Sequence, residues 1–287
     1  YVAISFVRRA ADIERVKRHI ASAGRNTPVI AKIEKPEALN DLTAILKIAD
    51  AIMVARGDLG VEMPAEQVPV VQKQLIEAAN AAGVPVITAT QMLDSMIRNP
   101  RPTRAEASDV ANAIIDGTDA VMLSGETASG LFPVESIQMM SRIAEVAEAS
   151  GRHGDVLRAT ELADSRPHTV AQALSAAACA IVQTLPVRAI VAFTMTGSTA
   201  RLVSHLRPTA PILAFTPSET VYHQLNLVWG VIPIRSAYVD RLDDLGDQVS
   251  KVLLERGYAQ KGDSVVMTGG HPIAARGQTN FVKVLQI

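Results

Sequence analysis

The stretch AIMVARGDLGVE, residues 51–62, contains the pattern from which the fold follows. An apolar run, AIMVA, is followed by an arginine, a glycine, an aspartate, a leucine and a second glycine. A continuous apolar run of this length is typical of a parallel strand buried on both faces. The sequence therefore predicts a buried strand, with Arg56 and Asp58 just beyond its carboxyl end.

Similar apolar runs recur through the first part of the chain. They occupy residues 1–7, 28–34, 51–56, 84–90 and 119–124. Amphipathic segments lie between them, and TRAE, residues 103–106, predicts a capping box at the start of one helix. Alternating strands and helices indicate an α/β fold, either a doubly wound open sheet or a (β/α)8 barrel.

The distribution of polar residues favours the barrel. Polar residues follow the strands as four pairs: Lys32 and Glu34, Arg56 and Asp58, Thr90 and Gln91, Ser124 and Glu126. A barrel brings all its strand ends to one mouth, whereas an open sheet concentrates binding at a switch point. With five strands visible, about three would lie before Tyr1. We therefore expect the sequence to begin inside a larger protein and, expressed alone, to be inactive and poorly soluble because its edge strands are exposed.

Composition excludes several classes of function. The 287 residues carry a net charge of −1 and only 3% aromatic side chains, which offers neither a field nor stacking surfaces for nucleic acid. No apolar run approaches the ~20 residues that span a bilayer. The single cysteine, Cys179, lies in an alanine-rich helical segment and is interpreted as a core residue. Without a disulfide framework or signal peptide, we expect a cytoplasmic protein.

The pattern changes after residue 150. Residues 149–169 are polar and without periodicity, which predicts a linker. A second alternation follows, with strands near 188–194, 211–216, 231–235 and 263–269, and with TPSE at 216–219 as a further capping box. We predict a barrel portion at 1–150 and a small α/β domain at 151–287, with an ordered core from about 165.

Three residues at the strand ends suggest a ligand site. Lys32 and Glu34 are two positions apart on a strand, so they share one side roughly 6.6 Å apart along the chain. They can form an ion pair, lie at a solvated strand end, or meet a ligand. Asp58 stands between Gly57 and Gly60, whose small size allows close backbone approach. Two carboxylates and a lysine at one mouth would suit Mg²⁺ and a substrate that carries carboxylate and phosphate groups. Thr90 adds a hydroxyl that can equally cap a turn.

Longer motifs give a specific resemblance. Residues 30–39 (IAKIEKPEAL), 52–62 (IMVARGDLGVE), 85–114, 116–136 (DGTDAVMLSGETASGLFPVES) and 194–208 (TMTGSTARLVSHLRP) occur in this order. Together they closely resemble pyruvate kinase over almost the whole chain. The resemblance implies a (β/α)8 barrel, a lid inserted after its third strand and a C-terminal regulatory domain. It also implies metal-dependent phosphoryl transfer from phosphoenolpyruvate to ADP in glycolysis, giving pyruvate and ATP.

The resemblance also implies roles for individual residues. Lys32 would stabilise the transferring phosphoryl group, and Glu34 and Asp58 would bind Mg²⁺ or Mn²⁺. The backbone of Gly57 and Asp58, with the Thr90 side chain, would hold the carboxylate end of the substrate. Ser124 and Glu126 would line the same mouth, near protonation of the enolate. Further phosphate, nucleotide and K⁺ contacts would come from residues before Tyr1.

In the second domain, hydroxyls cluster around Gly197. The stretch contains Thr194, Thr196, Ser198 and Thr199 where a strand meets a helix. Such residues can cap the helix or cradle a phosphate. The resemblance implies a site for a phosphorylated allosteric effector, although GGHPIAARGQTN, residues 269–280, has few of the basic and aromatic residues that bind sugar bisphosphates in some members. It also implies a homotetramer.

Two other functions compete with the kinase. One is a metal-dependent aldolase or lyase acting on pyruvate with a Glu/Asp metal pair on a related barrel. It would need neither Lys32 nor a regulatory second domain. The other is an inactive fragment that only binds metabolites.

Overall fold

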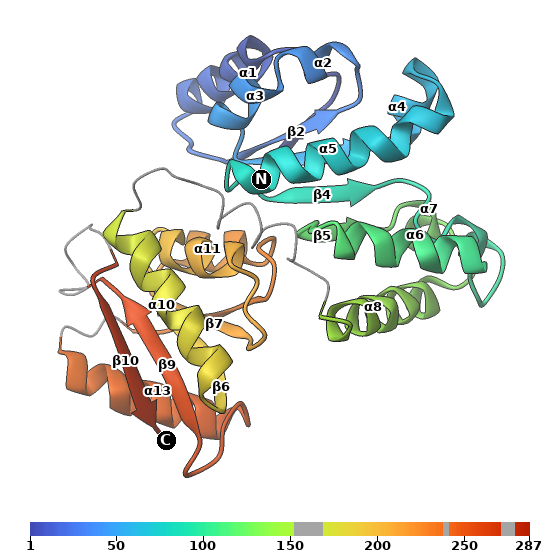
Figure 1. Ribbon diagram of the computed structural model, residues 1–287. Coiled ribbons are helices and arrows are strands. Elements are labelled where there is room, and N and C mark those ends of the chain that lie inside the picture. Colours follow the sequence, from blue (N-terminus) through green and yellow to red (C-terminus); the bar gives the residue numbers. More distant parts are fainter. Residues whose placement is uncertain (152–168, 238–240, 271–278) are drawn as a thin grey trace. The chain divides into compact units, whose positions relative to one another are not determined.

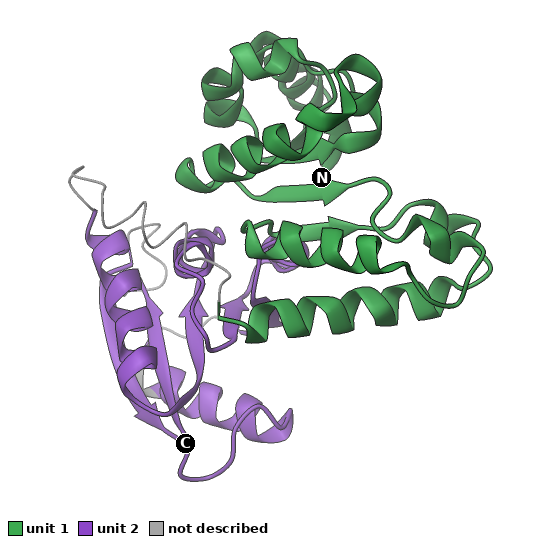
Figure 2. Ribbon diagram, turned by 45° about the vertical axis from the view of Figure 1, so that its right-hand side comes forward, with its two compact units in different colours: residues 1–162 green, residues 163–287 purple. Residues whose placement is uncertain are grey.

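The computed structural model describes residues 1–151, 169–237, 241–270 and 279–287. The chain divides into two compact units, Tyr1–Leu162 and Ala163–Ile287 (Figure 2). The predicted linker lies mostly on residues 152–168, outside the described residues, and the predicted boundary near residue 150 stays a prediction. No described helix is both long and apolar enough to cross a membrane.

The first unit contains a parallel five-stranded sheet. Its strands are β1 (Val2–Ile4), β2 (Val29–Ile33), β3 (Ala51–Ala55), β4 (Val86–Ala89) and β5 (Ala120–Met122). They pair in chain order, β1-β2-β3-β4-β5, with parallel register throughout. In a doubly wound sheet the order of the strands reverses at a switch point, whereas in a barrel the strands follow one another in chain order. The sheet is therefore an arc of a barrel.

Helices alternate with these strands. The α-helices are α1 (Ala10–Ser22), α2 (Glu37–Asn40), α3 (Leu42–Ile48), α4 (Arg56–Glu62), α5 (Val68–Ala81), α6 (Arg104–Ile115), α7 (Gly125–Ala128) and α8 (Pro133–Ala149). Two short 3₁₀ turns, η1 (Ala65–Gln67) and η2 (Asp94–Ile97), lie in the loops after β3 and β4. The helices follow their strands around the sheet (Figure 1). The capping box predicted at 103–106 is confirmed, because the Thr103 hydroxyl accepts the Glu106 amide and the Glu106 carboxylate accepts the Thr103 amide.

Burial explains why the strands were recognisable in the sequence. Every residue of β3 and β4 is buried, as expected for central parallel strands covered on both faces. At the amino ends of the strands, Asp50 accepts the Val29 amide at 2.7 Å and Asp119 accepts the Val86 amide at 2.9 Å. These bonds fix the edge opposite the polar strand ends. That edge therefore contributes to stability, and the carboxyl ends are left for binding.

The second unit is a five-stranded sheet with a different order. It contains β6 (Val187–Phe193), β7 (Ile212–Thr216), β8 (Val231–Arg235), β9 (Ser264–Gly269) and β10 (Phe281–Gln286). The order is β10-β9-β6-β7-β8, and β10 alone runs antiparallel to its neighbour. The four parallel strands were predicted from the sequence, whereas the edge strand β10, whose residues are half-buried or exposed, was not. Because the chain moves from β6 toward β8 and then returns to the other side of β6, a topological switch lies between β6 and β9.

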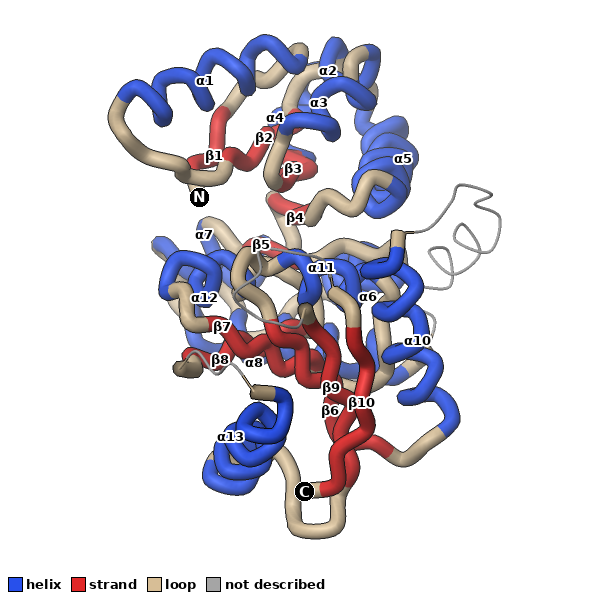
Figure 3. The backbone as a smooth tube through the Cα atoms, turned by 90° about the vertical axis from the view of Figure 1, so that its left-hand side faces the viewer, coloured by secondary structure: helices blue, strands red, loops and turns tan. Residues whose placement is uncertain are grey.

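Helices cover both faces of this second sheet (Figure 3). They are α10 (Val170–Thr184), α11 (Ser198–His205), α12 (Glu219–Leu225) and α13 (Leu242–Glu255). Alternate strand residues pack against α13 on one face and against α10, α11 and α12 on the other. Cys179 is buried in the latter cluster, where it was predicted. The capping box predicted at TPSE was wrong: α12 begins at Glu219, and the Ser218 hydroxyl accepts the Val221 amide as its cap.

Candidate active site

The carboxyl ends of β2, β3 and β4 lie side by side. The register pairs Ile33 with Val54 and Ala55 with Ala89. Glu34, Arg56 and Thr90 each directly follow one of these strands. The residues predicted to meet at a mouth are therefore brought to one edge of the sheet.

Lys32 and Glu34 contact each other. The Lys32 ammonium pairs with one Glu34 carboxylate oxygen and donates to the Ser5 hydroxyl at 3.1 Å. The other Glu34 oxygen accepts the Phe6 amide at 2.7 Å. The Glu34 side chain is 1% exposed, whereas the Lys32 side chain is 26% exposed. The buried carboxylate is thus held in place from two sides, while the lysine can still reach a ligand.

Gly57 and Asp58 lie in the first turn of α4, immediately after β3. Asp58 is exposed, and among the residues that the structure describes none bonds its carboxylate. A Cβ added to Gly57 would lie 2.7 Å from the Thr90 Cγ2 atom, closer than such atoms approach in proteins. Gly57 is therefore required here for space, because the Thr90 side chain occupies the place of a Cβ.

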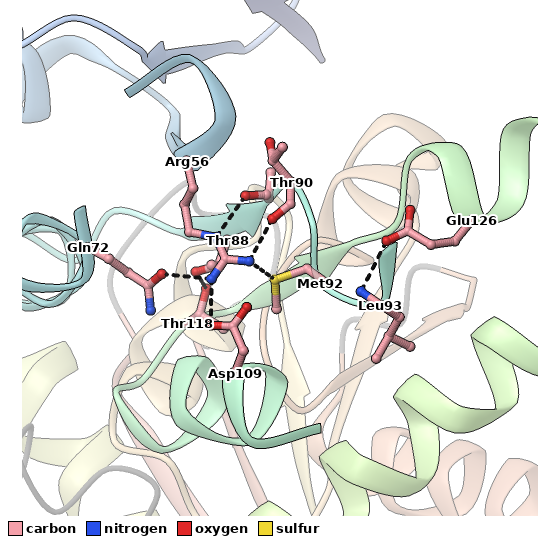
Figure 4. A network of polar contacts seen from close by, with 10 residues as sticks. Arg56, Gln72, Thr88, Thr90, Met92, Leu93, Asp109, Thr118 and Glu126 are labelled. Atoms are coloured by element: carbon pink, nitrogen blue, oxygen red, sulfur yellow. Dashed lines mark hydrogen bonds and ion pairs between the residues drawn. The ribbon is translucent and has the colours of Figure 1, made fainter. Parts of the chain in front are cut away.

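Arg56 organises the turn that carries Thr90 (Figure 4). Its guanidinium donates to the Thr90 carbonyl at 2.6 Å, the Ala89 carbonyl at 3.1 Å, the Asp109 carboxylate at 2.6 Å, the Gln72 amide oxygen at 3.2 Å and the Met92 sulfur at 2.8 Å. Thr90 has φ of +77°, which is unusual for a β-branched residue. Arg56 thus ties α4 to this strained turn and, through Asp109, to α6.

Two further glutamates join neighbouring segments at the same edge. Glu126 is 2% exposed and accepts the Ser124 amide at 2.8 Å and the Leu93 amide at 3.1 Å. It therefore connects the end of β5 to the loop after β4, while Ser124 itself is exposed. Both Glu126 oxygens are already bonded to backbone, so its contribution here is to position the loop.

Glu106 connects the start of α6 to η2. Its carboxylate accepts the Ser95 amide and hydroxyl, each at 2.6 Å, and the Thr103 amide and hydroxyl at 2.7 and 2.8 Å. Burial raises the pKa of this carboxyl, but the bonds from Ser95 and Thr103 outweigh burial and hold the pKa below its ordinary value.

Glu34 and Asp58, at the ends of adjacent strands, are the predicted cation ligands; one Glu34 oxygen is held by the Phe6 amide and the other is paired with the Lys32 ammonium. Within the described ranges, no group of three or more His, Cys, Asp and Glu side chains is placed to hold a metal ion. Mg²⁺ commonly takes only one or two carboxylates and completes its shell with waters and substrate oxygens. A buried carboxylate and an unbonded, exposed one on adjacent strand ends fit that donor set.

A cavity of about 430 Å³ lies beside this edge, between α5 and α6. Arg56 and Thr90 line it, together with Gln72 and Asp109. The same residues that fix the Thr90 turn thus form one wall of a hollow. From the sequence, Arg56 was predicted only as a polar residue at the end of a strand, and no pattern indicated Asp109 as its partner.

In the second unit, the predicted hydroxyl cluster follows β6 at the topological switch. Gly197 has φ of +88° and its amide bonds the Thr194 hydroxyl at 2.8 Å. The Thr199 hydroxyl is buried against that of Thr279 at 2.9 Å, so it is used internally. The hydroxyls of Thr196 and Ser198 are exposed and 3.1 Å apart. Most of the GGHPIAARGQTN loop, residues 271–278, is outside the described part of the chain.

Comparisons with known proteins agree with this architecture. Residues 1–137 match the domain described as "Pyruvate kinase, barrel domain", and residues 172–285 match "Pyruvate kinase, alpha/beta domain". A protein named pyruvate kinase 2 from Synechocystis sp. is 51% identical over 284 residues, covering 99% of this chain and 47% of that protein. Pyruvate kinase from Clostridium perfringens is 47% identical, covering 100% of this chain and 61% of the relative. Pyruvate kinase from Corynebacterium glutamicum is 48% identical, with 99% and 58% coverage.

The chain spans about half the length of the curated relatives it matches. The two domain matches confirm the predicted fold class, the later part of a (β/α)8 barrel followed by a small α/β domain. They cover both units, in the order in which the motifs occur in the sequence. The chain therefore belongs to the pyruvate kinase family.

Proposed function

We propose that this chain carries part of the active site of a pyruvate kinase, which transfers a phosphoryl group from phosphoenolpyruvate to ADP in glycolysis and yields pyruvate and ATP. The observation that carries the proposal is the partly exposed Lys32 ammonium beside buried Glu34, with exposed Asp58 following the adjacent strand. Phosphoryl transfer asks mainly for positioning and for neutralising charge on the phosphate oxygens. This edge of the sheet offers both groups that could position a substrate and groups that could neutralise its charge.

Each residue would have a distinct task. Lys32 would leave its ion pair in part to meet the charge that develops on the transferring group. Glu34 and Asp58 would hold Mg²⁺ or Mn²⁺, which when bound supplies positive charge to phosphate and carboxylate oxygens. The turn at Gly57, together with the Thr90 hydroxyl on a backbone that Arg56 holds, would orient the carboxylate end of phosphoenolpyruvate.

Substitution of Lys32 by methionine tests this proposal. The variant removes the ammonium but keeps the stem of the side chain, so substrate and Mn²⁺ should still bind. We expect kcat to fall by at least about 10³-fold with KM changed far less, because the charge is used mainly in the transition state. A coupled assay with phosphoenolpyruvate and ADP, run on the whole protein of which this chain is expected to be a part, measures both constants. Lys17→Met is the matched control, since Lys17 pairs with Asp50 at the opposite edge of the sheet. A Lys32→Met variant with near-normal kcat would refute the assignment.

We also propose that the loop at residues 194–199 binds the phosphate of an allosteric effector. Its support is the position after β6 at the topological switch, where ligands of open α/β sheets bind, and the exposed hydroxyls of Thr196 and Ser198. Replacing both residues by alanine should abolish any change in activity caused by sugar phosphates while leaving unactivated turnover intact. Equal activation of the variant and the unaltered protein would contradict this role.

Assembly as a homotetramer in the cytoplasm belongs to the same proposal and rests on family resemblance. Light scattering coupled to size-exclusion chromatography tests the tetramer directly. A monomer at micromolar concentration would contradict it.

A further inference from the structure

Lys35, the residue after Glu34, connects three loops at the candidate active site. Its ammonium forms an ion pair with the Glu62 carboxylate, at the last residue of α4. The same ammonium lies 5.5 Å from the centroid of the Phe6 ring, beyond the end of β1. Its side chain is only 18% exposed, so the ion pair is partly shielded from water. One side chain thus joins the ends of β1 and β2 to the end of α4.

Besides this ion pair, the end of α4 is held by apolar contacts of Leu59 and of Met63, which directly follows the helix. The helix has seven residues and contains Gly60, and a helix so short is marginal without tertiary support. Leu59 is fully buried, but Val61 is 84% exposed and packs little. Arg56 anchors the first residue of the helix through its bonds to the Thr90 turn. Glu62 supplies the corresponding anchor at the other end, and Asp58 lies between the two.

The contact with Phe6 leads to the other candidate metal ligand. The Phe6 amide donates to Glu34 at 2.7 Å, and Phe6 has φ of +57° although its ring is exposed. A bulky residue in that conformation needs external support. The Lys35 ammonium over the ring is a favourable cation–π contact that opposes relaxation of this turn. Lys35 therefore influences the positions of both Glu34 and Asp58.

We infer that Lys35 is a positioning residue, which together with Glu62 and Phe6 fixes Asp58 relative to Glu34 and thereby sets the affinity of the site for a divalent cation. This inference rests on the proposed function, because it takes Glu34 and Asp58 as the metal ligands. Lys35 touches neither the cation nor the substrate in this role. Residues that orient metal ligands commonly contribute ~10–100-fold to metal affinity.

Charge and position predict opposite results for this lysine. As a bare positive charge near the site, Lys35 would repel a divalent cation, so Lys35→Met would tighten Mn²⁺ binding. As a positioning residue, its removal frees the end of α4 and weakens binding. Glu62→Gln weakens binding in both cases. The double variant distinguishes the two roles, because its two charge changes cancel. A role as a bare charge then predicts normal Mn²⁺ affinity, whereas a positioning role predicts weaker binding, since the anchor is still lost.

The experiment measures Mn²⁺ affinity of the purified protein by electron paramagnetic resonance, together with hydrogen exchange of the α4 amides without metal. We expect Lys35→Met, Glu62→Gln and the double variant each to bind Mn²⁺ about tenfold more weakly, with faster exchange at the end of α4. Lys35→Arg keeps both contacts and should stay within about threefold of the unaltered protein. Lys17→Met, which breaks the Lys17–Asp50 pair at the far edge, should change neither measurement.

Tighter binding in Lys35→Met, or normal affinity in the double variant, would overturn the inference while leaving the metal site itself intact. If Lys35→Met does not fold, hydrogen exchange in Glu62→Gln still decides, because a lost charge leaves the α4 amides unchanged in the absence of metal, whereas a lost anchor speeds their exchange at the end of the helix. Faster exchange supports the anchor, and unchanged exchange contradicts it. Absence of saturable Mn²⁺ binding in the unaltered protein would instead refute the proposed function, and the positioning role with it.

Discussion

Replacing Arg56 by lysine should release the turn that carries Thr90. The guanidinium reaches the Thr90 and Ala89 carbonyl groups and the Asp109 carboxylate in a fixed planar arrangement. A lysine ammonium is a single point with three donors, so it can retain the bond to Asp109 but not both carbonyl bonds. The variant therefore keeps the positive charge and loses the planar arrangement of donors.

The expected size follows from the bonds removed. Hydrogen bonds that involve a charged group contribute about 1.5–3 kcal/mol each, so losing one or both carbonyl bonds costs about 1.5–6 kcal/mol. The φ of +77° at Thr90 stores strain of the order of 1–3 kcal/mol. Because the bonds that are lost contribute at least as much free energy as the strain costs, losing them should allow Thr90 to leave this conformation. We expect KM for phosphoenolpyruvate to rise about tenfold, as the Thr90 hydroxyl is no longer held in place.

Hydrogen exchange of the β4 and α6 amides measures the stability change. Fluorescence would not report it, because the single tryptophan, Trp229, lies in the second unit. A double-mutant cycle between Arg56→Lys and Asp109→Asn should show a coupling energy of about 1 kcal/mol or more, since both residues serve one network. Additive effects within about 0.5 kcal/mol, together with an unchanged KM, would refute the reasoning.

Three other predictions concern single residues of the same unit. Gly57→Ala places a Cβ 2.7 Å from the Thr90 Cγ2 atom and should destabilise the unit by about 1–3 kcal/mol. Thr90→Ser removes the Cγ2 atom, so the double variant should regain stability in thermal unfolding. A double variant no more stable than Gly57→Ala contradicts this account. Glu34→Gln and Asp58→Asn should each weaken Mn²⁺ binding, with a combined loss smaller than the sum, and calorimetric titrations showing full additivity would separate them into different sites. Since the folded pKa of Glu106 is depressed, its stabilisation is present above the ordinary glutamate pKa of about 4.3 and is lost as pH falls through the folded value. Between about pH 5 and 3, the free energy of unfolding obtained from denaturation curves should fall less steeply with decreasing pH in Glu106→Gln than in the unaltered protein. An identical pH dependence would exclude this carboxyl as a contributor.

The strands of both sheets could be predicted because they are short apolar runs with polar ends. The run predicted at 51–56 is a strand at Ala51–Ala55, and VIPIR at 231–235 is a strand over its whole length. The edge strand β10 was missed because its residues are only half-buried or exposed and do not alternate regularly, so neither a continuous buried run nor a period of two marks it. The start of α12 was misplaced because two hydroxyl residues compete for the cap, and a sequence pattern does not decide between Thr216 and Ser218.

The candidate site was predicted in its residues but not in its connections. Period-two alternation was sufficient to place Lys32 and Glu34 on one side of a strand. The partners of Arg56 lie 16 to 53 residues away, and two of them are backbone carbonyl groups, which leave no trace in the side-chain sequence. The positive φ of Thr90 was equally hidden, because threonine is not a residue that signals such a conformation.

The carboxylates of the first unit show how the candidate site is held open for a ligand. Glu34 accepts the Phe6 amide, Glu126 accepts the Leu93 amide and Glu106 accepts the Ser95 amide, so each uses an oxygen to fix a loop next to its own. These bonds occupy acceptors that would otherwise compete for a cation, and they lower the conformational freedom of the loops before any ligand arrives. Asp58 differs: its carboxylate is exposed, and within the described residues it has no such bond. Glu126 and Glu106 therefore serve geometry alone, whereas Glu34 fixes the Phe6 turn with one oxygen and keeps the other, paired with Lys32, for the proposed metal site beside Asp58.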